Sequence, residues 1–172
     1  TMFDEEEHFK INAFDWRAEF GEVFRGANPG FDAVIGNPPY GAELASDLRE
    51  YLLDIFSGGN SDTAALFVEH GLSLLSRCGY LGFIIPKPFI YASNWKKLRD
   101  ITLPHMQLLV DVSKVWREVK LEQCIVIFSK QPSKPNYSCN VRNLTNFIYL
   151  GEISKNLVNE FGFILNGITP EE

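Results

Sequence analysis

Two kinds of hydrophobic pattern alternate along the first 130 residues of the chain. Continuous apolar runs rich in β-branched residues predict buried strands at residues 31–36, 80–85, 107–112 and 123–128. Segments whose apolar residues recur at helical spacing predict helices at residues 46–56, 61–77 and 95–103. Glycines and prolines separate most of these elements. The pattern therefore predicts alternating strands and helices.

This alternation indicates the fold class. Strands that are apolar on both faces are typical of a sheet between two layers of helices, so we expect an α/β fold with a parallel sheet and helices on both faces. The runs at residues 107–112 and 123–128 are separated by about ten residues without a convincing helix. A connection that short suits antiparallel strands, and we expect these two runs to form a hairpin at the edge of the sheet.

The composition changes after Ser129. Residues 131–136 form a polar, proline-containing segment, and residues 137–172 contain only short strand-like and helical pieces. We therefore predict a main domain at residues 1–130, followed at residues 131–172 by a linker and the start of a further region.

The 172 residues, 45% of them hydrophobic, suffice for one compact domain with a buried core. No apolar run reaches the roughly 18 residues of a membrane helix, and the acidic beginning of the chain does not resemble a signal peptide. We expect a cytoplasmic protein that has no membrane partner. Cys78, Cys124 and Cys139 are far apart and the histidines show no ligand spacing, so we expect neither a disulfide framework nor a metal site.

The formal net charge of −6 disfavours a protein that coats nucleic acid without specificity, because phosphate binding requires a positive surface. The charge is unevenly distributed, however. Residues 87–120 hold seven Lys or Arg against three Asp or Glu, a local charge of +4. Such a stretch is most often an ordinary solvated surface, so it supports nucleic-acid binding only together with a second signal.

The clearest chemical feature is the tetrapeptide Asn37-Pro38-Pro39-Tyr40, which follows the first predicted strand. Parallel sheets bind ligands at the carboxyl ends of their strands. Two prolines make the turn rigid and leave the Asn37 side-chain oxygen and the Pro38 carbonyl as paired acceptors. Such a pair suits an exocyclic amine, whose nitrogen becomes more nucleophilic when both hydrogens are accepted, and Tyr40 offers a face for a flat ring. The alternative is a strand-ending turn without chemical function.

With these motifs the sequence resembles the N6-adenine-specific DNA methyltransferases of restriction-modification systems, in particular the Eco57I-like group with the gamma order of motifs. The resemblance covers residues 12–130. The matching segments are residues 31–40 (motif IV), 62–75 (motif V), 79–86 (motif VI), Val115-Trp116 (motif VIII) and, more weakly, Asp15-Trp16 (motif III). Four matches in the family order are far more specific than the tetrapeptide alone.

The resemblance implies a partial Rossmann-like methyltransferase fold, an S-adenosylmethionine cofactor, and double-stranded DNA whose target adenine is flipped out of the helix. By position, Asn37 and the Pro38 carbonyl would bind the adenine amine, and Pro39 would keep the catalytic turn rigid. Tyr40 and Trp116 would stack on the two faces of the base. The cofactor-binding residues that the resemblance implies are Asp15, Asn37 and Phe67.

Two parts of such a cofactor site are missing. The family pattern places a glycine-containing loop and an acidic residue for the ribose hydroxyls upstream of motif III, and neither occurs in these 172 residues. We expect that the chain begins inside a methyltransferase domain, and that on its own it folds but does not methylate. A parallel sheet without its first strands has an open edge and an uncovered face, so we also expect self-association.

Two other functions are compatible with the sequence. Protein-glutamine N5 methyltransferases use an Asn-Pro-Pro-Tyr motif in the same way, to accept hydrogen bonds from a glutamine amide. They need no pair of stacking aromatics, so Trp116 and the basic stretch favour DNA. A non-catalytic module that binds DNA or a partner subunit would keep the tetrapeptide without transferring methyl groups. The resemblance also implies a fused or partner restriction nuclease, which is an expectation at the level of the family.

Overall fold

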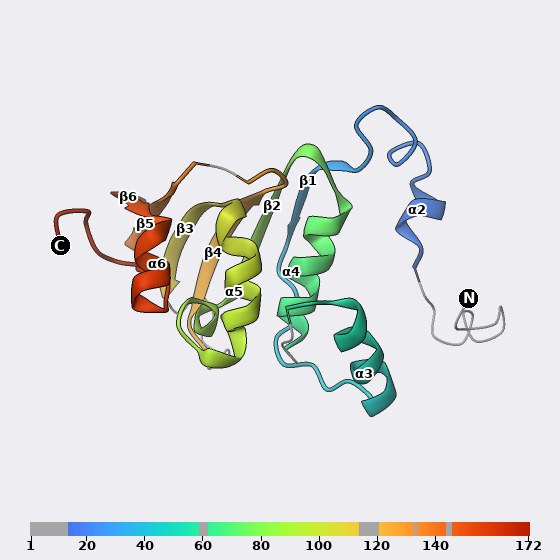
Figure 1. The fold of residues 1–172 in the computed structure, drawn as a ribbon, viewed down its shortest axis with the longest axis horizontal. Coiled ribbons are helices and arrows are strands. Elements are labelled where there is room, and N and C mark those ends of the chain that lie inside the picture. Colours follow the sequence, from blue (N-terminus) through green and yellow to red (C-terminus); the bar gives the residue numbers. More distant parts are fainter. Residues whose placement is uncertain (1–13, 59–61, 114–120, 133, 144–145) are drawn as a thin grey trace.

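A computed structural model describes residues 14–172, except residues 59–61, 114–120, 133 and 144–145 (Figure 1). Its strands are β1 (Phe31–Gly36), β2 (Leu75–Pro86), β3 (Met106–Ser113), β4 (Gln123–Ser129), β5 (Asn136–Asn143) and β6 (Asn146–Ser154). Its α-helices are α2 (Trp16–Glu19), α3 (Ser46–Ile55), α4 (Thr63–Leu74), α5 (Lys96–Thr102) and α6 (Lys155–Phe161). Three short 3-10 helices flank α5, namely η1 (Lys87–Ile90), η2 (Ser93–Trp95) and η3 (Leu103–His105).

All six strands belong to one mixed sheet with the order β1-β2-β4-β3-β5-β6. β1 is parallel to β2. β4 is antiparallel to both of its neighbours, β2 and β3, so β1, β2 and β3 run in the same direction. Their carboxyl ends therefore lie at one edge of the sheet, which we call the carboxyl edge.

The predicted antiparallel pairing of residues 107–112 with residues 123–128 is confirmed by the pairing of β3 with β4. The pair does not form the edge of the sheet, however. β4 inserts between β2 and β3, and β5 occupies the outer side of β3 in a parallel arrangement. β6 then pairs with β5, so part of the segment expected as a further region extends the same sheet.

One face of the sheet is covered by α4, α5 and α6 (Figure 1). α4 begins at a well-defined cap, because the Asp62 side chain accepts a hydrogen bond from the Ala64 N–H at 2.9 Å. The strand side chains that face these helices are buried, and those of β2 and β4 are Leu81, Phe83, Ile85, Cys124, Val126 and Phe128. Full burial of an aliphatic or aromatic side chain stabilises a fold by about 1.5–3 kcal/mol. This helical layer therefore holds the central strands in place.

The opposite face of the sheet carries the side chains that alternate with the buried ones. On it, Ile35 of β1 is 83% exposed and Tyr80 of β2 is 52% exposed. The segment with α2 packs beside the start of β1, where Trp16 and Phe20 make edge contacts with Phe31. The α/β class is thus confirmed, while the layer formed by α4, α5 and α6 lies on one face only.

Residues beyond position 130 contribute to the same core. Tyr137 and Cys139 of β5 and the later Ile164 are all 0% exposed. The Tyr137 hydroxyl donates to the Leu165 carbonyl at 2.7 Å, and the Ile164 N–H donates to the Ile90 carbonyl at 2.9 Å. The carboxyl-terminal segment is therefore packed onto the sheet, whereas the domain boundary after residue 130 stays a prediction.

Candidate active site

The Asn-Pro-Pro-Tyr tetrapeptide leaves the sheet at the carboxyl edge, directly after β1. Gly30 determines how β1 starts, since its φ is +116° and a Cβ there would lie 2.5 Å from the Leu75 carbonyl carbon. Glycine permits this close approach, which begins the parallel pairing of β1 with β2. Beyond the strand, Pro38 is buried while Asn37 and Pro39 are exposed. The Asn37 side chain therefore lies at the end of β1 in a position that a ligand can reach.

The Tyr40 hydroxyl orients that side chain. It donates to Asn37 Oδ1 at 2.7 Å and lies 3.2 Å from the Ile84 carbonyl oxygen on β2. Burial, and then the nearby Cys124 and Asp62, raise the pKa of Tyr40 to about 12. The hydroxyl therefore stays protonated at neutral pH and remains a donor. Because an amide oxygen has two lone pairs, Asn37 Oδ1 can accept a second hydrogen bond from a ligand.

The loop after the tetrapeptide is fastened to the start of α4. Thr63 Oγ1 donates to the Pro39 carbonyl at 2.8 Å and accepts from the Ala42 N–H at 3.3 Å. Asp62, which caps α4, also accepts from the Gly41 N–H at 3.4 Å. The tetrapeptide is therefore held on two sides, by β2 and by α4. Such rigid support lets a turn present its polar atoms in a fixed geometry.

An apolar hollow of about 260 Å³ adjoins this loop between α3 and α4. Thr63 forms part of its wall, as does the ring of Phe67, which is 47% exposed. Burial lowers the pKa of His70, another lining residue, so its imidazole is neutral at pH 7. The remaining lining side chains are Leu44, Leu52, Phe56 and Leu66. An uncharged apolar wall of this kind suits a flat aromatic ring.

A second hollow, of about 470 Å³, shares Leu44 with the first and is more polar. Its charged lining residues are Glu43, Arg49 and Asp62. The loop after the tetrapeptide thus separates an apolar recess from a polar one. This combination suits a ligand that has both a flat ring and polar or charged groups.

Asp15 lies near the opposite end of β1. Its carboxylate accepts from the Arg17 N–H at 2.8 Å and from the Ala18 N–H at 3.1 Å, which makes it the cap of α2. The adjacent Trp16 contacts Phe31, the first residue of β1, whereas the tetrapeptide follows the last. The structure therefore brings Asn37, Tyr40 and Phe67 to one region and leaves Asp15 apart, and the cofactor role of Asp15 stays a prediction.

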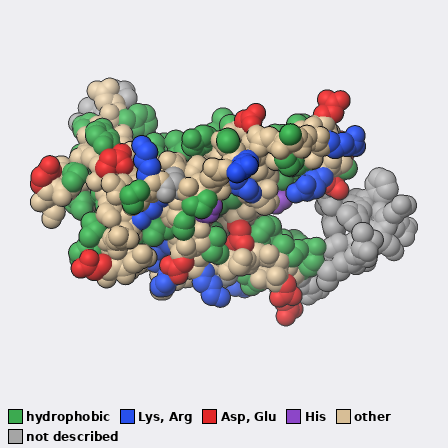
Figure 2. Space-filling view, turned by 45° about the horizontal axis from the view of Figure 1, so that its top comes forward, with side chains coloured by type: hydrophobic (Ala, Val, Ile, Leu, Met, Phe, Trp, Pro, Cys, Tyr) green, Lys and Arg blue, Asp and Glu red, His purple; other side chains and the backbone are tan. Residues whose placement is uncertain are grey.

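Trp116 lies outside the described residues, as do three of the seven basic residues of the stretch 87–120. Of the other four, Lys87 and Lys96 are paired with carboxylates, and Arg99 is buried against backbone carbonyls. Figure 2 shows Lys and Arg side chains scattered among hydrophobic and acidic ones on the face in view. The described part of this stretch is therefore not a continuous basic patch.

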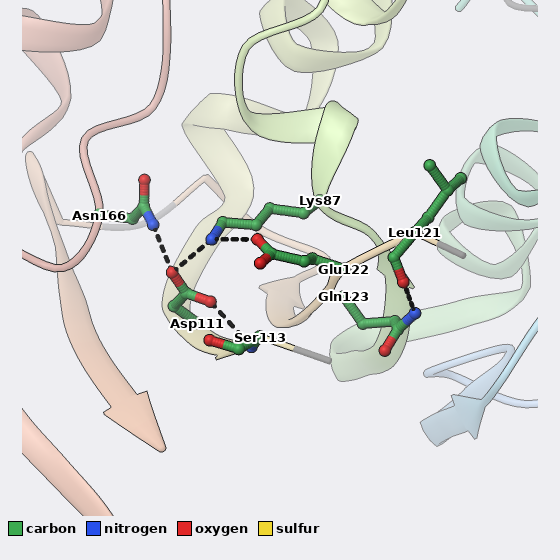
Figure 3. Close-up of polar contacts among 7 residues, drawn as sticks. All are labelled: Lys87, Asp111, Ser113, Leu121, Glu122, Gln123 and Asn166. Carbon is green, nitrogen blue, oxygen red and sulfur yellow. Dashed lines mark hydrogen bonds and ion pairs between the residues drawn. The ribbon is translucent and has the colours of Figure 1, made fainter. Parts of the chain in front are cut away.

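A charged cluster at the carboxyl edge was not predicted from the sequence (Figure 3). Lys87 lies between Asp111 and Glu122, and Asn166 contacts Asp111 from the carboxyl-terminal segment. Burial alone would lower the pKa of Lys87, but hydrogen bonds to Glu122 and Asp111 raise it overall, so the ammonium stays charged. The sequence indicated this cluster only through the positions of its residues: Lys87 closely follows the apolar run at residues 80–85, and Asp111 lies within the run at residues 107–112.

The three cysteines of the described residues are all free, and Cys78 is exposed. Cys124 and Cys139 are buried free thiols, and burial raises the pKa of Cys124, which keeps it protonated. In the same part of the chain, no group of three His, Cys, Asp or Glu side chains could hold a metal ion. No helix described there has the length and apolar character needed to cross a membrane.

Known proteins match much of this chain. The family model of the Eco57I restriction-modification methylase matches residues 2–116. The type II restriction enzyme and methyltransferase RM.Eco57I of Escherichia coli is 30% identical over 138 residues, covering 74% of this chain and 13% of that protein. The adenine-specific methyltransferase BrxX of Escherichia coli O9:H4 (strain HS) is 34% identical over 86 residues, covering 44% of this chain and 7% of that protein.

The fold is similar to that of solved restriction-modification proteins. A type I restriction-modification system methyltransferase subunit from Streptococcus thermophilus aligns with a TM-score of 0.50 and 17% identity, over 68% of this chain and 27% of its own. This likeness concerns the fold, and it agrees with the α/β methyltransferase fold predicted from the sequence. The chain spans 7% to 36% of the lengths of the curated relatives it matches.

Proposed function

Since the chain belongs to the Eco57I restriction-modification methylase family, we propose that it supplies the catalytic part of a DNA methyltransferase that acts on the N6 amine of adenine. The observation that carries the proposal is the hydrogen bond from Tyr40 to Asn37 at the carboxyl edge. It fixes an amide acceptor beside an aromatic ring, where sheets of this class bind ligands. The name of the relative BrxX, an adenine-specific methyltransferase, supports adenine as the target.

In the proposed reaction, a flipped adenine donates one N6 hydrogen to Asn37 Oδ1 and the other to the Pro38 carbonyl. These acceptors reduce delocalisation of the nitrogen lone pair into the ring, which makes the nitrogen a better nucleophile. S-adenosylmethionine, when bound, would supply the methyl group from its sulfonium, and the S–CH3 bond would break with its electron pair staying on sulfur, so that S-adenosylhomocysteine leaves as a neutral thioether. As the new N–C bond forms, the two acceptors stabilise the positive charge on nitrogen, and the surplus proton passes to water.

Stacking on Tyr40 helps to keep the base out of the duplex. Extruding a base costs a few kcal/mol, and stacking on an aromatic side chain returns about 1–3 kcal/mol. The hydroxyl contacts with Asn37 and Ile84 fix the Tyr40 ring against β2. In the proposal, Trp116 supplies the second face, so that two aromatic rings offset much of the cost.

The residues of this chain fit part of an S-adenosylmethionine site. Phe67 and the apolar hollow between α3 and α4 suit the adenine ring of the cofactor, and Asn37 lies at the adjoining edge. Asp15 lies near the other end of β1, beside the contact of Trp16 with Phe31. We therefore propose that a longer protein supplies the remaining cofactor contacts, and that the isolated chain folds without methylating. Detectable turnover by the purified chain would contradict this.

The same longer protein would bind double-stranded DNA and be fused to, or paired with, a restriction nuclease. The relative RM.Eco57I is named as both a restriction enzyme and a methyltransferase, which supports this combination. The acidic net charge of −6 in this chain agrees with DNA contacts that come mainly from other parts of that protein.

Methyl transfer by the full-length protein tests the proposed function. Labelled S-adenosylmethionine and unmethylated plasmid DNA, followed by nucleoside analysis, should yield N6-methyladenine. Asn37→Ala should abolish the product, and Asn159→Ala, which removes an exposed asparagine on α6, should not. Cofactor binding without transfer to DNA would overturn the proposal and favour a protein-glutamine acceptor. Absence of cofactor binding would favour a non-catalytic module.

A further inference from the structure

The polar recess of about 470 Å³ lies beside the tetrapeptide at the carboxyl edge. Residues 41–44, which directly follow Tyr40, form one of its walls, and Arg49 of α3 contributes to another. Asn94 lines the recess from residues 87–95, the segment after β2 that we call the β2 loop. Figure 1 shows α3 and the β2 loop at the same end of the sheet. Three separate parts of the chain therefore meet around this recess.

The β2 loop is a firmly anchored wall. Phe89 and Trp95 are buried, and their rings meet edge to face with 6.0 Å between the centroids. The buried Arg99 of α5 donates from Nη1 to the Phe89 carbonyl at 3.0 Å and to the Ala92 carbonyl at 2.7 Å. Asn94 lies between these anchors and is itself exposed. The loop therefore holds Asn94 at the recess with little conformational entropy left to lose when a ligand binds.

The charges that line the recess differ in how freely they can act on a ligand. Arg49 is exposed and supplies the positive charge. The Asp62 carboxylate is engaged by backbone donors, since it accepts from the Ala64 N–H at 2.9 Å and from the Gly41 N–H at 3.4 Å. Glu43 is exposed and carries the opposite charge. Arg49 therefore attracts an anionic group in the recess, whereas Glu43 opposes it.

Two features favour a phosphate of nucleic acid over the zwitterionic tail of the cofactor as that anionic group. In the proposed function Tyr40 stacks on a flipped adenine, and the phosphates of the same nucleotide must lie close to the residues that follow Tyr40. In addition, Lys97 is exposed and lies only three residues after Asn94. Positive charge thus continues beyond the recess, which benefits a polyanion and not a small ligand that has an ammonium group.

We propose that the polar recess binds a backbone phosphate of the target strand next to the flipped adenine. Arg49 supplies charge-assisted hydrogen bonds, and the Asn94 amide donates a further one. Holding the phosphate helps to keep the nucleotide outside the duplex once its base has left the stack. The inference rests on the proposed function and deepens it, because it assigns residues of this chain to the DNA backbone.

Arg77 provides a matched control for Arg49. It is also an exposed arginine, but it lies near the start of β2, at the opposite end of this strand from the carboxyl edge. Its substitution therefore controls for the loss of one positive charge as such. Glu43→Gln provides a variant for which the opposite effect is expected.

The test uses the full-length protein with Arg49→Gln, Arg49→Lys, Asn94→Ala, Glu43→Gln and Arg77→Gln. Binding to a fragment of unmethylated plasmid DNA is measured at several salt concentrations without S-adenosylmethionine. Each phosphate contact contributes about −0.9 to the slope of log affinity against log salt concentration. Arg49→Gln should therefore weaken binding about tenfold and make the slope shallower by about 1. Affinity for S-adenosylmethionine, measured separately, should be retained.

Arg49→Lys should keep most of the slope, and Asn94→Ala should weaken binding without changing the slope, because it removes no charge. Glu43→Gln should strengthen binding, and Arg77→Gln should behave as wild type. These substitutions concern exposed side chains, so the melting temperature should stay close to that of the wild type. If Arg49→Gln nevertheless does not fold, the opposite effects of Asn94→Ala and Glu43→Gln on DNA affinity decide the inference.

A salt slope in Arg49→Gln equal to that of the wild type would overturn the inference. A loss of S-adenosylmethionine affinity with an unchanged slope would overturn it too and would assign the recess to the tail of the cofactor. Methyl transfer by the wild type to the same DNA is assayed in parallel. Absence of transfer would refute the proposed function, while the salt slopes would still decide whether the recess contacts a phosphate.

Discussion

Replacing Tyr40 with phenylalanine separates the two roles that we propose for this residue, orienting Asn37 and stacking on the target base. The substitution keeps the ring and removes the hydroxyl that donates to Asn37 Oδ1 at 2.7 Å. A hydrogen bond of this kind contributes about 0.5–1.5 kcal/mol net, so the rate of methyl transfer should fall roughly 2- to 12-fold. Tyr40→Ala also removes the stacking surface, which adds about 1–3 kcal/mol, and should reduce the rate by at least a further fivefold or so.

The assay is single-turnover methyl transfer by the full-length protein on unmethylated plasmid DNA with saturating S-adenosylmethionine. Tyr80→Phe is the control, because Tyr80 is half-exposed on the far face of the sheet. The rates should fall in the order wild type and Tyr80→Phe, then Tyr40→Phe, then Tyr40→Ala. Equal rates for wild type and Tyr40→Phe would refute the orienting role of the hydroxyl. Equal losses in Tyr40→Phe and Tyr40→Ala would refute the separation of hydroxyl from ring.

Two further predictions concern the chain as a folded body. The isolated chain should self-associate through its uncovered face, and Ile35→Lys should raise the dissociation constant about tenfold or more, because it removes roughly 1.5–3 kcal/mol of apolar burial. Sedimentation velocity at several concentrations measures the association, with Leu48→Lys on α3 as the control. A monomer at every concentration would contradict the prediction. The pKa of Tyr40 is raised from 10.0 to about 12 on folding, so its contribution to the free energy of unfolding is complete below pH 10 and is lost as the pH rises to about 12. Urea titrations should show that the free energy of unfolding falls less between pH 10 and about 12 in Tyr40→Phe than in the wild-type protein. Equal decreases in the two proteins would contradict this prediction.

Local patterns predicted most of the elements that build the site. The apolar run at residues 31–36, followed by two prolines, indicated both β1 and the turn that displays Asn37. The boundary between α4 and β2 was less accurate, because the predicted helix at residues 61–77 ends at Leu74 and β2 begins at once with Leu75. Pairing of Leu75 with Phe31 draws this residue into the sheet, and such a contact is not visible in helical periodicity.

The order of strands could not be predicted in the same way. β5 presents buried Tyr137 and Cys139 between polar neighbours, so the segment has little hydrophobic signal of its own. It becomes a strand because the outer side of β3 offers unpaired backbone groups, which is a property of the assembled sheet. The Lys87–Asp111 contact was missed for a related reason, since it depends on β2 and β3 flanking β4.

The position of β1 at the margin of the sheet has a consequence for local unfolding. β1 has six residues and one hydrogen-bonded neighbour in the sheet as described, whereas the twelve residues of β2 lie between two strands. Detaching β1 therefore breaks fewer contacts than detaching β2, and native-state exchange should find it among the first segments to open. The tetrapeptide should open together with β1, because it continues directly from this strand. Any polypeptide that pairs with the outer side of β1 would then order the tetrapeptide without touching it, because it would raise the free energy needed to detach β1.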